Sequence, residues 1–178
     1  MRLIAPGSSE VSAPVSLRSD GMVISTEQGT VPSGIDLEIS GPIKDAGGRF
    51  IAKTGPGTLL LSGVNTFNGN ITVSAGTLIV GGSGLLNSGA FTATIINNGI
   101  FKYAGSGSQA LGPVSGGGNL IQDGPGQLTI NGVTNYAGDT TLNGRTLEIV
   151  QGPLAANSAV ELAGVATLRL YVGSVDTV

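Results

Sequence analysis

The chain has 178 residues, of which 31 are glycine, 40% are apolar and only 11% are charged, and its formal net charge is −3. This apolar content excludes a disordered chain, and the slight acidity with scattered Lys and Arg argues against a nucleic-acid partner. The absence of Cys and His excludes disulfides, thiolate nucleophiles and the usual zinc sites, and no apolar run approaches the roughly 20 residues of a membrane span.

Short segments of alternating apolar and polar residues, separated by turns rich in Gly, Asn and Ser, predict β-strands along most of the chain. Residues 1–21 lack a clear pattern and are expected to form an irregular lead. The predicted strands lie at 22–25, 35–40, 50–53, 58–62, 71–73, 77–80, 92–96, 100–103, 119–122, 127–130, 140–142, 146–150, 160–162 and 167–172.

A segment at 55–80 is repeated without a gap at 124–149, so every position of the first copy has its counterpart at one constant offset. Alternate positions stay apolar in both copies, while the positions between them drift to polar. Leu60 becomes Thr129, for example, and Ile79 becomes Glu148. This period of two indicates strands with one buried and one solvated face.

Matching positions in successive strands suggest a structural unit of about 22 residues, so that the repeat offset corresponds to about three units. The positions form two interleaved series, one through Leu59, Leu78, Phe101, Leu128, Leu147 and Leu168, the other through Ile51, Thr72, Ile95, Leu120, Thr141 and Glu161.

Stacked units of this kind predict an all-β fold, a right-handed parallel β-helix of about eight coils spanning 1–178 as a single segment. A plain meander or sandwich does not explain matching strands one unit apart. The predicted core is made of inward Leu, Ile and Val ladders: Leu59, Leu61, Val73, Leu78, Val80, Leu128, Ile130, Leu142, Leu147 and Ile149.

The stretches ISGP at 39–42 and GGRFIAKTGPGTLLLSGVNTFNGNITVSAGTLIVG at 47–81 resemble the passenger-associated transport repeat of bacterial autotransporters, also called the autotransporter-associated β-strand repeat. This copy lies near 39–81, and a second copy near 116–150 is a weaker match. The resemblance implies a β-helix in a secreted or surface-displayed passenger, a scaffold and secretion aid without catalytic residues. The family's outer-membrane barrel and a signal peptide are not recognisable here, and we expect the chain to be a fragment of a larger passenger.

Several residues have side chains suited to catalysis or binding. Asp36 and Glu38 are alternate residues and are interpreted as a solvated strand face rather than an acid–base pair. Arg49, Lys53 and Asp123 would lie near one another if the coils stack in register, as in β-helix enzymes that cut acidic polysaccharides. We predict no catalytic, cofactor-binding or metal-binding residues, and no cofactor.

Other motifs are given structural interpretations. The glycine-rich GGSG at 81–84 lacks the Asp needed for calcium, and GPG at 55–57 is not followed by a helix, as a dinucleotide site would require. The sequon at 70–72 is interpreted as a turn entering a strand. Phe67 and Tyr136, equivalent in the two copies, are expected to pack in the core or at the rim.

Three functions follow as hypotheses. The first is a rigid structural or adhesive segment of a surface passenger, which aids secretion and presents a binding surface to a host cell or matrix. The second is a self-assembling extracellular fibre subunit, which stacks head to tail through uncapped solenoid ends. The third is a polysaccharide-degrading enzyme on a β-helix.

Overall fold

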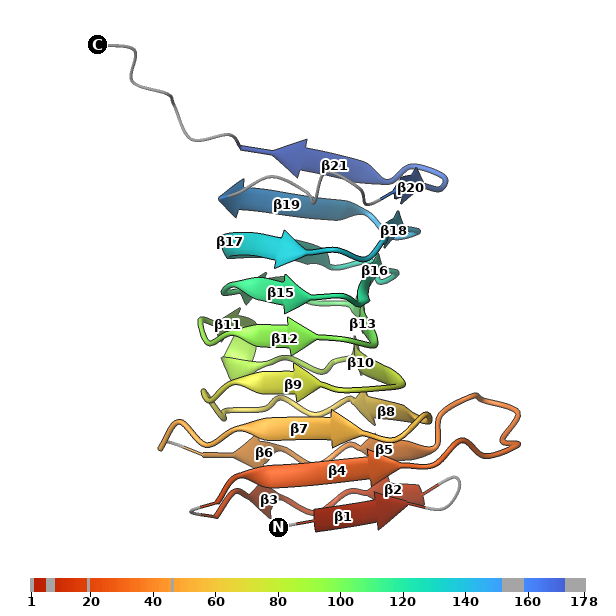
Figure 1. The fold of residues 1–178 in the computed structure, drawn as a ribbon, viewed down its shortest axis with the longest axis vertical. Helices are drawn as coiled ribbons and strands as arrows, with labels where there is room; N and C mark the ends of the chain where they lie inside the picture. Colours follow the sequence, from red (N-terminus) through yellow and green to blue (C-terminus); the bar gives the residue numbers. More distant parts are fainter. Residues whose placement is uncertain (1, 6–8, 19, 46, 152–158, 172–178) are drawn as a thin grey trace.

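A computed structural model describes residues 2–5, 9–18, 20–45, 47–151 and 159–171. The described residues form a stack of short parallel strands (Figure 1). The elements are β1 (Arg2–Ala5), β2 (Ser9–Val11), β3 (Val15–Ser16), β4 (Met22–Thr26), β5 (Leu37–Ile39), β6 (Ile43–Lys44), β7 (Ile51–Thr54), β8 (Thr58–Leu61), β9 (Ile71–Val73), β10 (Thr77–Gly82), the 3₁₀ turn η1 (Asn87–Gly89), β11 (Ala90–Phe91), β12 (Ile95–Asn97), β13 (Ile100–Gly105), β14 (Gln109–Leu111), β15 (Val114–Gly116), β16 (Asn119–Gln122), β17 (Gln127–Tyr136), β18 (Thr140–Leu142), β19 (Thr146–Gln151), β20 (Val160–Leu162) and β21 (Thr167–Leu170).

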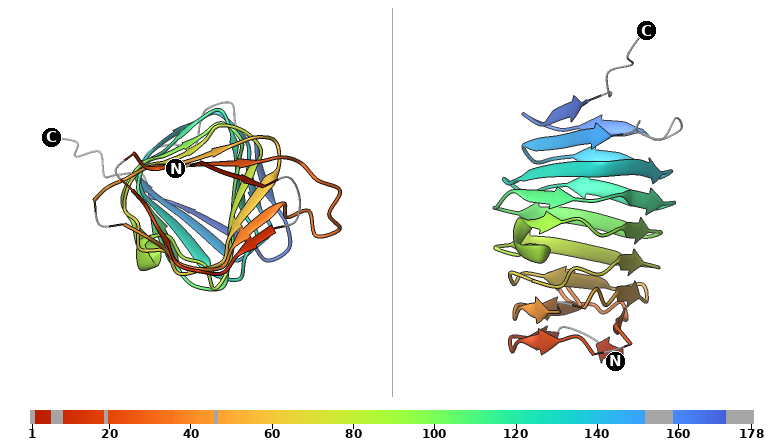
Figure 2. Two further views of the ribbon diagram at one scale, coloured as in Figure 1. Left: turned by 90° about the horizontal axis from the view of Figure 1, so that it is seen from below. Right: turned by 90° about the vertical axis from the view of Figure 1, so that its left-hand side faces the viewer.

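The strands form a parallel β-solenoid with three sides, seen end-on in Figure 2. The first side stacks β1, β4, β7, β9, β12, β15 and the end of β17. The second side is an eight-stranded sheet in the order β2, β5, β8, β10, β13, β16, β18 and β20. The third side holds the β3–β6 pair and, further along, β11, β14, the start of β17, β19 and β21.

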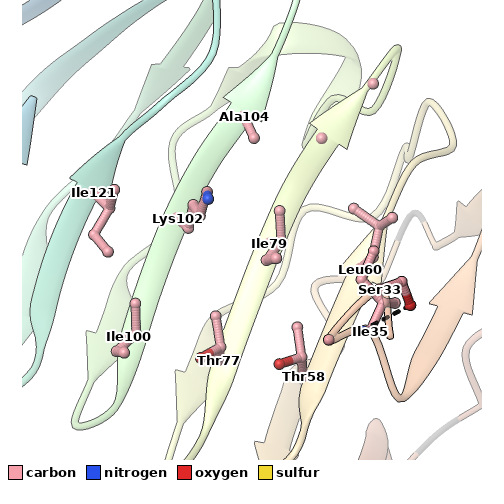
Figure 3. A pocket seen from close by; sticks show the side chains of 13 residues that line it. Ser33, Ile35, Thr58, Leu60, Thr77, Ile79, Ile100, Lys102, Ala104 and Ile121 are labelled. Carbon is pink, nitrogen blue, oxygen red and sulfur yellow. Dashed lines mark hydrogen bonds between the residues drawn. The ribbon is translucent and has the colours of Figure 1, made fainter. Parts of the chain in front are cut away.

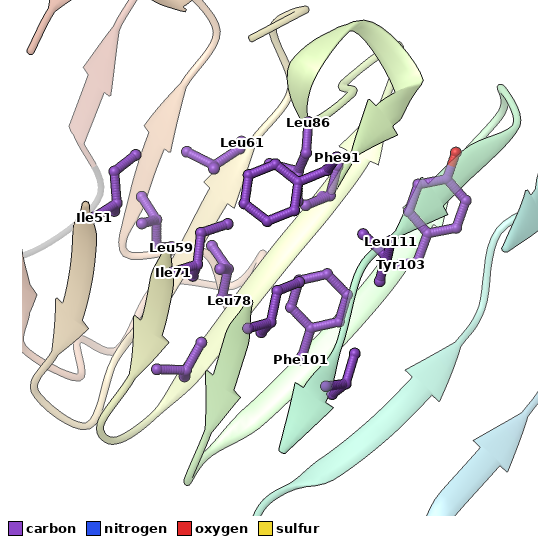
Figure 4. Close-up of a cluster of buried hydrophobic side chains, with 14 of the residues drawn as sticks. Ile51, Leu59, Leu61, Ile71, Leu78, Leu86, Phe91, Phe101, Tyr103 and Leu111 are labelled. Atoms are coloured by element: carbon purple, nitrogen blue, oxygen red, sulfur yellow. The ribbon is translucent and has the colours of Figure 1, made fainter. Parts of the chain in front are cut away.

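The core is a column of apolar ladders inside the stack, part of which is drawn in Figure 4. All ten residues predicted for the core are fully buried, with 0% exposure. They face inward because a strand alternates its side chains between the two faces of a sheet. Aromatic side chains also pack in the column, where the rings of Phe67 and Phe91 meet edge to face with centroids 5.8 Å apart.

The repeat is out of phase with the coils, which corrects the predicted strand series. Leu59 pairs with Leu78, Leu78 with Phe101, and Phe101 with Leu120 rather than Leu128. Leu128 instead pairs with Gln109, on the third side. The offset between the two copies therefore corresponds to three coils and one further side, so the second copy is turned about the axis relative to the first.

The second predicted series is also shifted in register. Ile51 pairs with Ile71 and not with Thr72, because β7 and β9 align their inward residues. The strand β17 itself runs from one side to the next: its first part pairs with β14 and β19, the register shifts between Ile130 and Val133, and its last part pairs with β15.

The start of the chain contains strands where the sequence predicts an irregular lead. Within 1–21, β1, β2 and β3 pair with β4, β5 and β6 respectively. The pattern is hard to recognise because these strands are very short. A coil near the start is also longer than those that follow, because it contains the loop between β4 and β5: Met22 pairs with Ile51, whereas Ile51 pairs with Ile71. The solenoid completes about six turns, slightly fewer than the eight predicted from the average unit.

Glycine allows the corners of neighbouring coils to approach closely. A Cβ atom on Gly126 would lie 1.8 Å from the carbonyl oxygen of Gly107 in the coil beneath. Gly76 combines a positive φ of +68° with a contact of 2.4 Å from such an atom to the Gly57 oxygen. Its counterpart in the second copy is Arg145, which is not among the described residues with positive φ. The corner conformation at that position therefore differs between the copies.

Candidate binding surface

A groove of about 520 Å³ lies on the outward face of the second side, shown in Figure 3. We call it the outer groove. It crosses strands β8, β10, β13 and β16, and the loop between β4 and β5 borders it at one end. Its lining residues are Ser33, Gly34, Ile35, Thr58, Leu60, Thr77, Ile79, Gly81, Gly82, Ile100, Lys102, Ala104 and Ile121.

The floor of the groove follows the register of the sheet. One outward row runs through Leu60, Ile79, Lys102 and Ile121, each paired directly with the next. All four side chains are half-buried. Outward positions of a solenoid are ordinarily polar, so three aliphatic residues in one row give the surface an unusual apolar stripe.

Small residues make the surface concave. Gly81 pairs with Ala104 in the same sheet, and both line the groove beside the larger side chains. Thr58 and Thr77 form a second row next to Leu60 and Ile79 (Figure 3). The groove thus combines a hydrophobic floor with hydroxyl groups along one edge.

The loop that borders the groove extends outward from the stack (Figure 2) and spans 27–36. Asp36 holds its base: one carboxylate oxygen accepts a hydrogen bond from the Gly29 amide at 2.6 Å, and the other accepts one from the Thr58 amide at 2.7 Å. Asp36 is only 2% exposed, which makes the interpretation of it as part of a solvated face wrong. Two backbone donors compensate for the burial of the carboxylate.

Acidic residues mark the end of the groove nearest the start of the chain. Glu10 and Glu38 line a smaller hollow of about 300 Å³ together with Ser9, Ser33 and Ile35, and the last two also line the outer groove. Glu38 accepts a hydrogen bond from the Ser62 hydroxyl, and Glu10 accepts one from Ser40. Among the described residues, no Lys or Arg forms an ion pair with either carboxylate.

The cation inside the groove is neutralised. Lys102 forms an ion pair with Asp123 in the next coil, and the hydrogen bond from Lys102 lowers the pKa of Asp123 against the opposing effect of burial. The floor of the groove is therefore close to neutral, while its Glu10–Glu38 end is negative.

The cationic and acidic residues considered for an enzyme site do not come together. Arg49 pairs with Asp45, whose pKa is lowered by the backbone hydrogen bond from Arg49. Asp123 pairs with Lys102 instead. Among the described residues, no group of three or more acidic side chains is placed to hold a metal ion.

Lys53 is buried inside the solenoid. Its Nζ donates to the carbonyl oxygens of Thr54, Gly55 and Ala75 at 3.0, 2.8 and 3.1 Å. Burial lowers the pKa of Lys53 to about 8, although the nearby carboxylates of Asp36 and Glu27 act to raise it. The role of Lys53 is structural, because its ammonium group donates hydrogen bonds to carbonyl oxygens at the corners and does not face an open cavity.

The remaining motifs have structural roles. Asn70 accepts a hydrogen bond from the Thr94 amide at the entry to β9, as expected of a turn. Phe67 and Tyr136 are both buried, which confirms core packing. The outer groove was not predicted from the sequence, although a signal was present: Leu60 and Ile79 are apolar at outward positions whose counterparts in the second copy are Thr129 and Glu148.

Comparison with known proteins supports the repeat. Residues 51–80 and 120–149 match the model of the Passenger-associated-transport-repeat. The chain is similar to the "Adhesin BmaC autotransporter" of Brucella suis biovar 1 (strain 1330), with 35% identity over 145 residues that cover 63% of this chain and 4% of that relative. It therefore spans only a small part of the relative's length. No solved structure matches the chain.

The two matches confirm the resemblance to autotransporter passenger repeats and indicate a secreted or cell-surface location. The offset between the matched ranges is the same as the offset found within the sequence, from 55–80 to 124–149. No helix among the described residues is long and apolar enough to cross a membrane.

Proposed function

We propose that residues 1–178 are one continuous stalk segment of an autotransporter passenger, with a non-enzymatic, adhesive role. The passenger repeats and the similarity to an adhesin support this proposal. In it, the solenoid supplies a rigid rod, and the outer groove supplies the surface that meets a host cell or matrix.

The ladders of paired strands explain why the segment forms a rod. Each coil pairs with the coils on either side of it through parallel strands about 4.8 Å apart, so about six turns extend the stalk by roughly 30 Å. The observation that supports adhesion most directly is the outer groove, because a stalk alone requires no apolar stripe on a solvated face.

A binding assay with the purified segment tests the adhesive role. Labelled protein is applied to cultured cells and to immobilised matrix, and its retention is compared with that of Ile79→Glu, which introduces the residue of the second copy. We expect this variant to lose most of the binding. Val133→Ser removes an apolar residue outside the groove that is 59% exposed and serves as the matched control. Equal retention of all three proteins would contradict the proposal.

A second candidate is head-to-tail assembly. The strands β20 and β21 each pair on one side only among the described strands, and Leu162, Leu170 and Tyr171 are about half exposed there. Such an edge can pair with another coil. Sedimentation velocity over a range of concentrations tests this function, which predicts growing species; a single monomeric species at high concentration would exclude it.

A further inference from the structure

Building on the proposed function, we infer that the outer groove binds an extended polypeptide with a basic end. The Lys, Arg or terminal amine of the ligand lies at Glu10 and Glu38, and its apolar side chains lie over Leu60, Ile79 and Ile121. The ligand runs along the solenoid axis, across the strands.

A single outward column of residues is acidic at one end and mostly aliphatic along the rest of its length. Glu10 pairs with Glu38, Glu38 with Leu60, and the column continues through Ile79, Lys102 and Ile121. Two carboxylates without a described cationic partner precede the aliphatic stripe. A complementary ligand is therefore cationic at one end and apolar along the rest.

The length of this column fits a short peptide. Six strands spaced about 4.8 Å apart place the ends of the column roughly 24 Å from one another. An extended polypeptide rises about 3.3 Å per residue, so about seven residues span the column. Recognition of a short peptide in a surface groove is a recurring mode of binding.

The side chains that line the groove favour a peptide over a lipid or a glycan. Thr58 and Thr77 present hydroxyl groups beside the aliphatic row, where they can pair with backbone amides that a hydrocarbon chain lacks. Among the described residues that line the groove none is aromatic, so the stacking surface that commonly holds sugar rings is missing.

The ion pair of Lys102 sets the orientation. Asp123 already neutralises this cation, so a basic group of the ligand gains no net attraction at this end. The basic end of the peptide is therefore favoured at the carboxylates.

The test uses fluorescence anisotropy with a labelled octapeptide of two arginines followed by alternating leucine and serine. Two control peptides carry glutamine or glutamate in place of the arginines. We expect the arginine peptide to bind the full chain at least about ten times more tightly than the glutamate peptide, with a preference that weakens as salt is added. Equal binding of all three peptides would overturn the inference.

Variants locate the site. Glu10→Gln with Glu38→Gln keeps an oxygen for the serine hydroxyls and should remove the preference for arginine over glutamine. Glu161→Gln lies in the same outward column, beyond the groove, and should change nothing. Unchanged circular dichroism confirms that the variants are folded. An arginine preference that survives in the double variant would contradict the proposed orientation.

The outcomes separate this inference from the proposed function. Retention on cells or matrix that depends on Ile79, without binding of the arginine peptide, would reject the peptide inference and leave the adhesive role standing. Binding to vesicles of aminated lipid in place of the peptide would assign the groove to lipid and overturn the inference. Loss of both retention and peptide binding would reject both.

Discussion

Lys53 and Gln122 occupy equivalent positions in the two copies of the repeat and lie on different sides of the solenoid. Lys53 is in β7 on the first side, and Gln122 is in β16 on the second. Each side chain is buried and donates both to the corner that follows it and to the next coil: Lys53 to Gly55 and Ala75, Gln122 to Gly126 and Thr146. The repeat therefore preserves a local corner structure while its direction around the axis changes.

Replacement of Lys53 by methionine should destabilise the solenoid. The apolar side chain fills a similar volume but leaves three corner carbonyls without their donor, and we expect a loss of about 1–3 kcal/mol. Lys53→Gln should cost less, because Gln122 shows that an amide can serve such a corner. Urea unfolding followed by circular dichroism measures both changes. Lys44→Met, at an exposed lysine, is the control and should have little effect.

The stability of the protein should rise between about pH 7.5 and 9.5. The pKa of Lys53 is lowered from 10.5 to about 8 in the folded chain, so the unfolded chain binds more protons in this range and stability increases with pH, by about 1–2 kcal/mol. Burial raises the pKa of Tyr103, which has the opposite effect above about pH 10. Thermal unfolding at several pH values checks this, and the rise should disappear in Lys53→Met.

Two glycine-to-alanine substitutions should differ sharply in their effect on the stability of the solenoid. Gly126→Ala places a methyl group 1.8 Å from the Gly107 oxygen, so the coils must separate, and we expect a loss of more than about 2 kcal/mol. Gly117 has open space around it and no positive φ. Gly117→Ala should be neutral or stabilising by up to about 1 kcal/mol. Thermal melting compares the two; similar melting temperatures would refute the close packing at the corner.

Tyr136 and Thr140 should show energetic coupling. Their hydroxyl oxygens are 2.6 Å apart and both side chains are buried. Tyr136→Phe leaves the Thr140 hydroxyl without this partner and should cost about 1–2 kcal/mol. Combining it with Thr140→Val removes both hydroxyls, so the double variant should lose less than the sum of the single variants. A double-mutant cycle in urea measures the difference. Additive losses would show that the hydrogen bond contributes little.

Much of the fold could be predicted from the sequence because alternation is a local signal. Leu128 and Ile130 stay apolar where Leu59 and Leu61 are, and all four are buried. The register could not be predicted from the repeat alone. Since every side of the solenoid requires the same alternation, Leu128 fits the ladder of Phe101 as well as that of Gln109. The pairing of β14 with β17 shows which ladder it joins, because Leu128 lies opposite Gln109.

The outer groove depends on that register. Leu60 and Ile79 could be recognised as outward and apolar, but their alignment with Glu38 and Ile121 in one column requires the pairing of successive coils. The burial of Asp36 was likewise hidden, because the amides of Gly29 and Thr58 that bind it come from separate parts of the chain. Local patterns do not report such contacts.

The displacement of the two repeat copies onto different sides is the central feature of this structure, and engineered disulfides test it most directly. The chain contains no cysteine, and paired residues of adjacent strands lie at a distance suitable for a disulfide. Lys102→Cys with Ile121→Cys should cross-link under mild oxidation, because these residues are direct partners on the second side. Lys102→Cys with Thr129→Cys should remain reduced, since Thr129 pairs with Ala110 on the third side. Efficient cross-linking of the second pair and not the first would contradict the account.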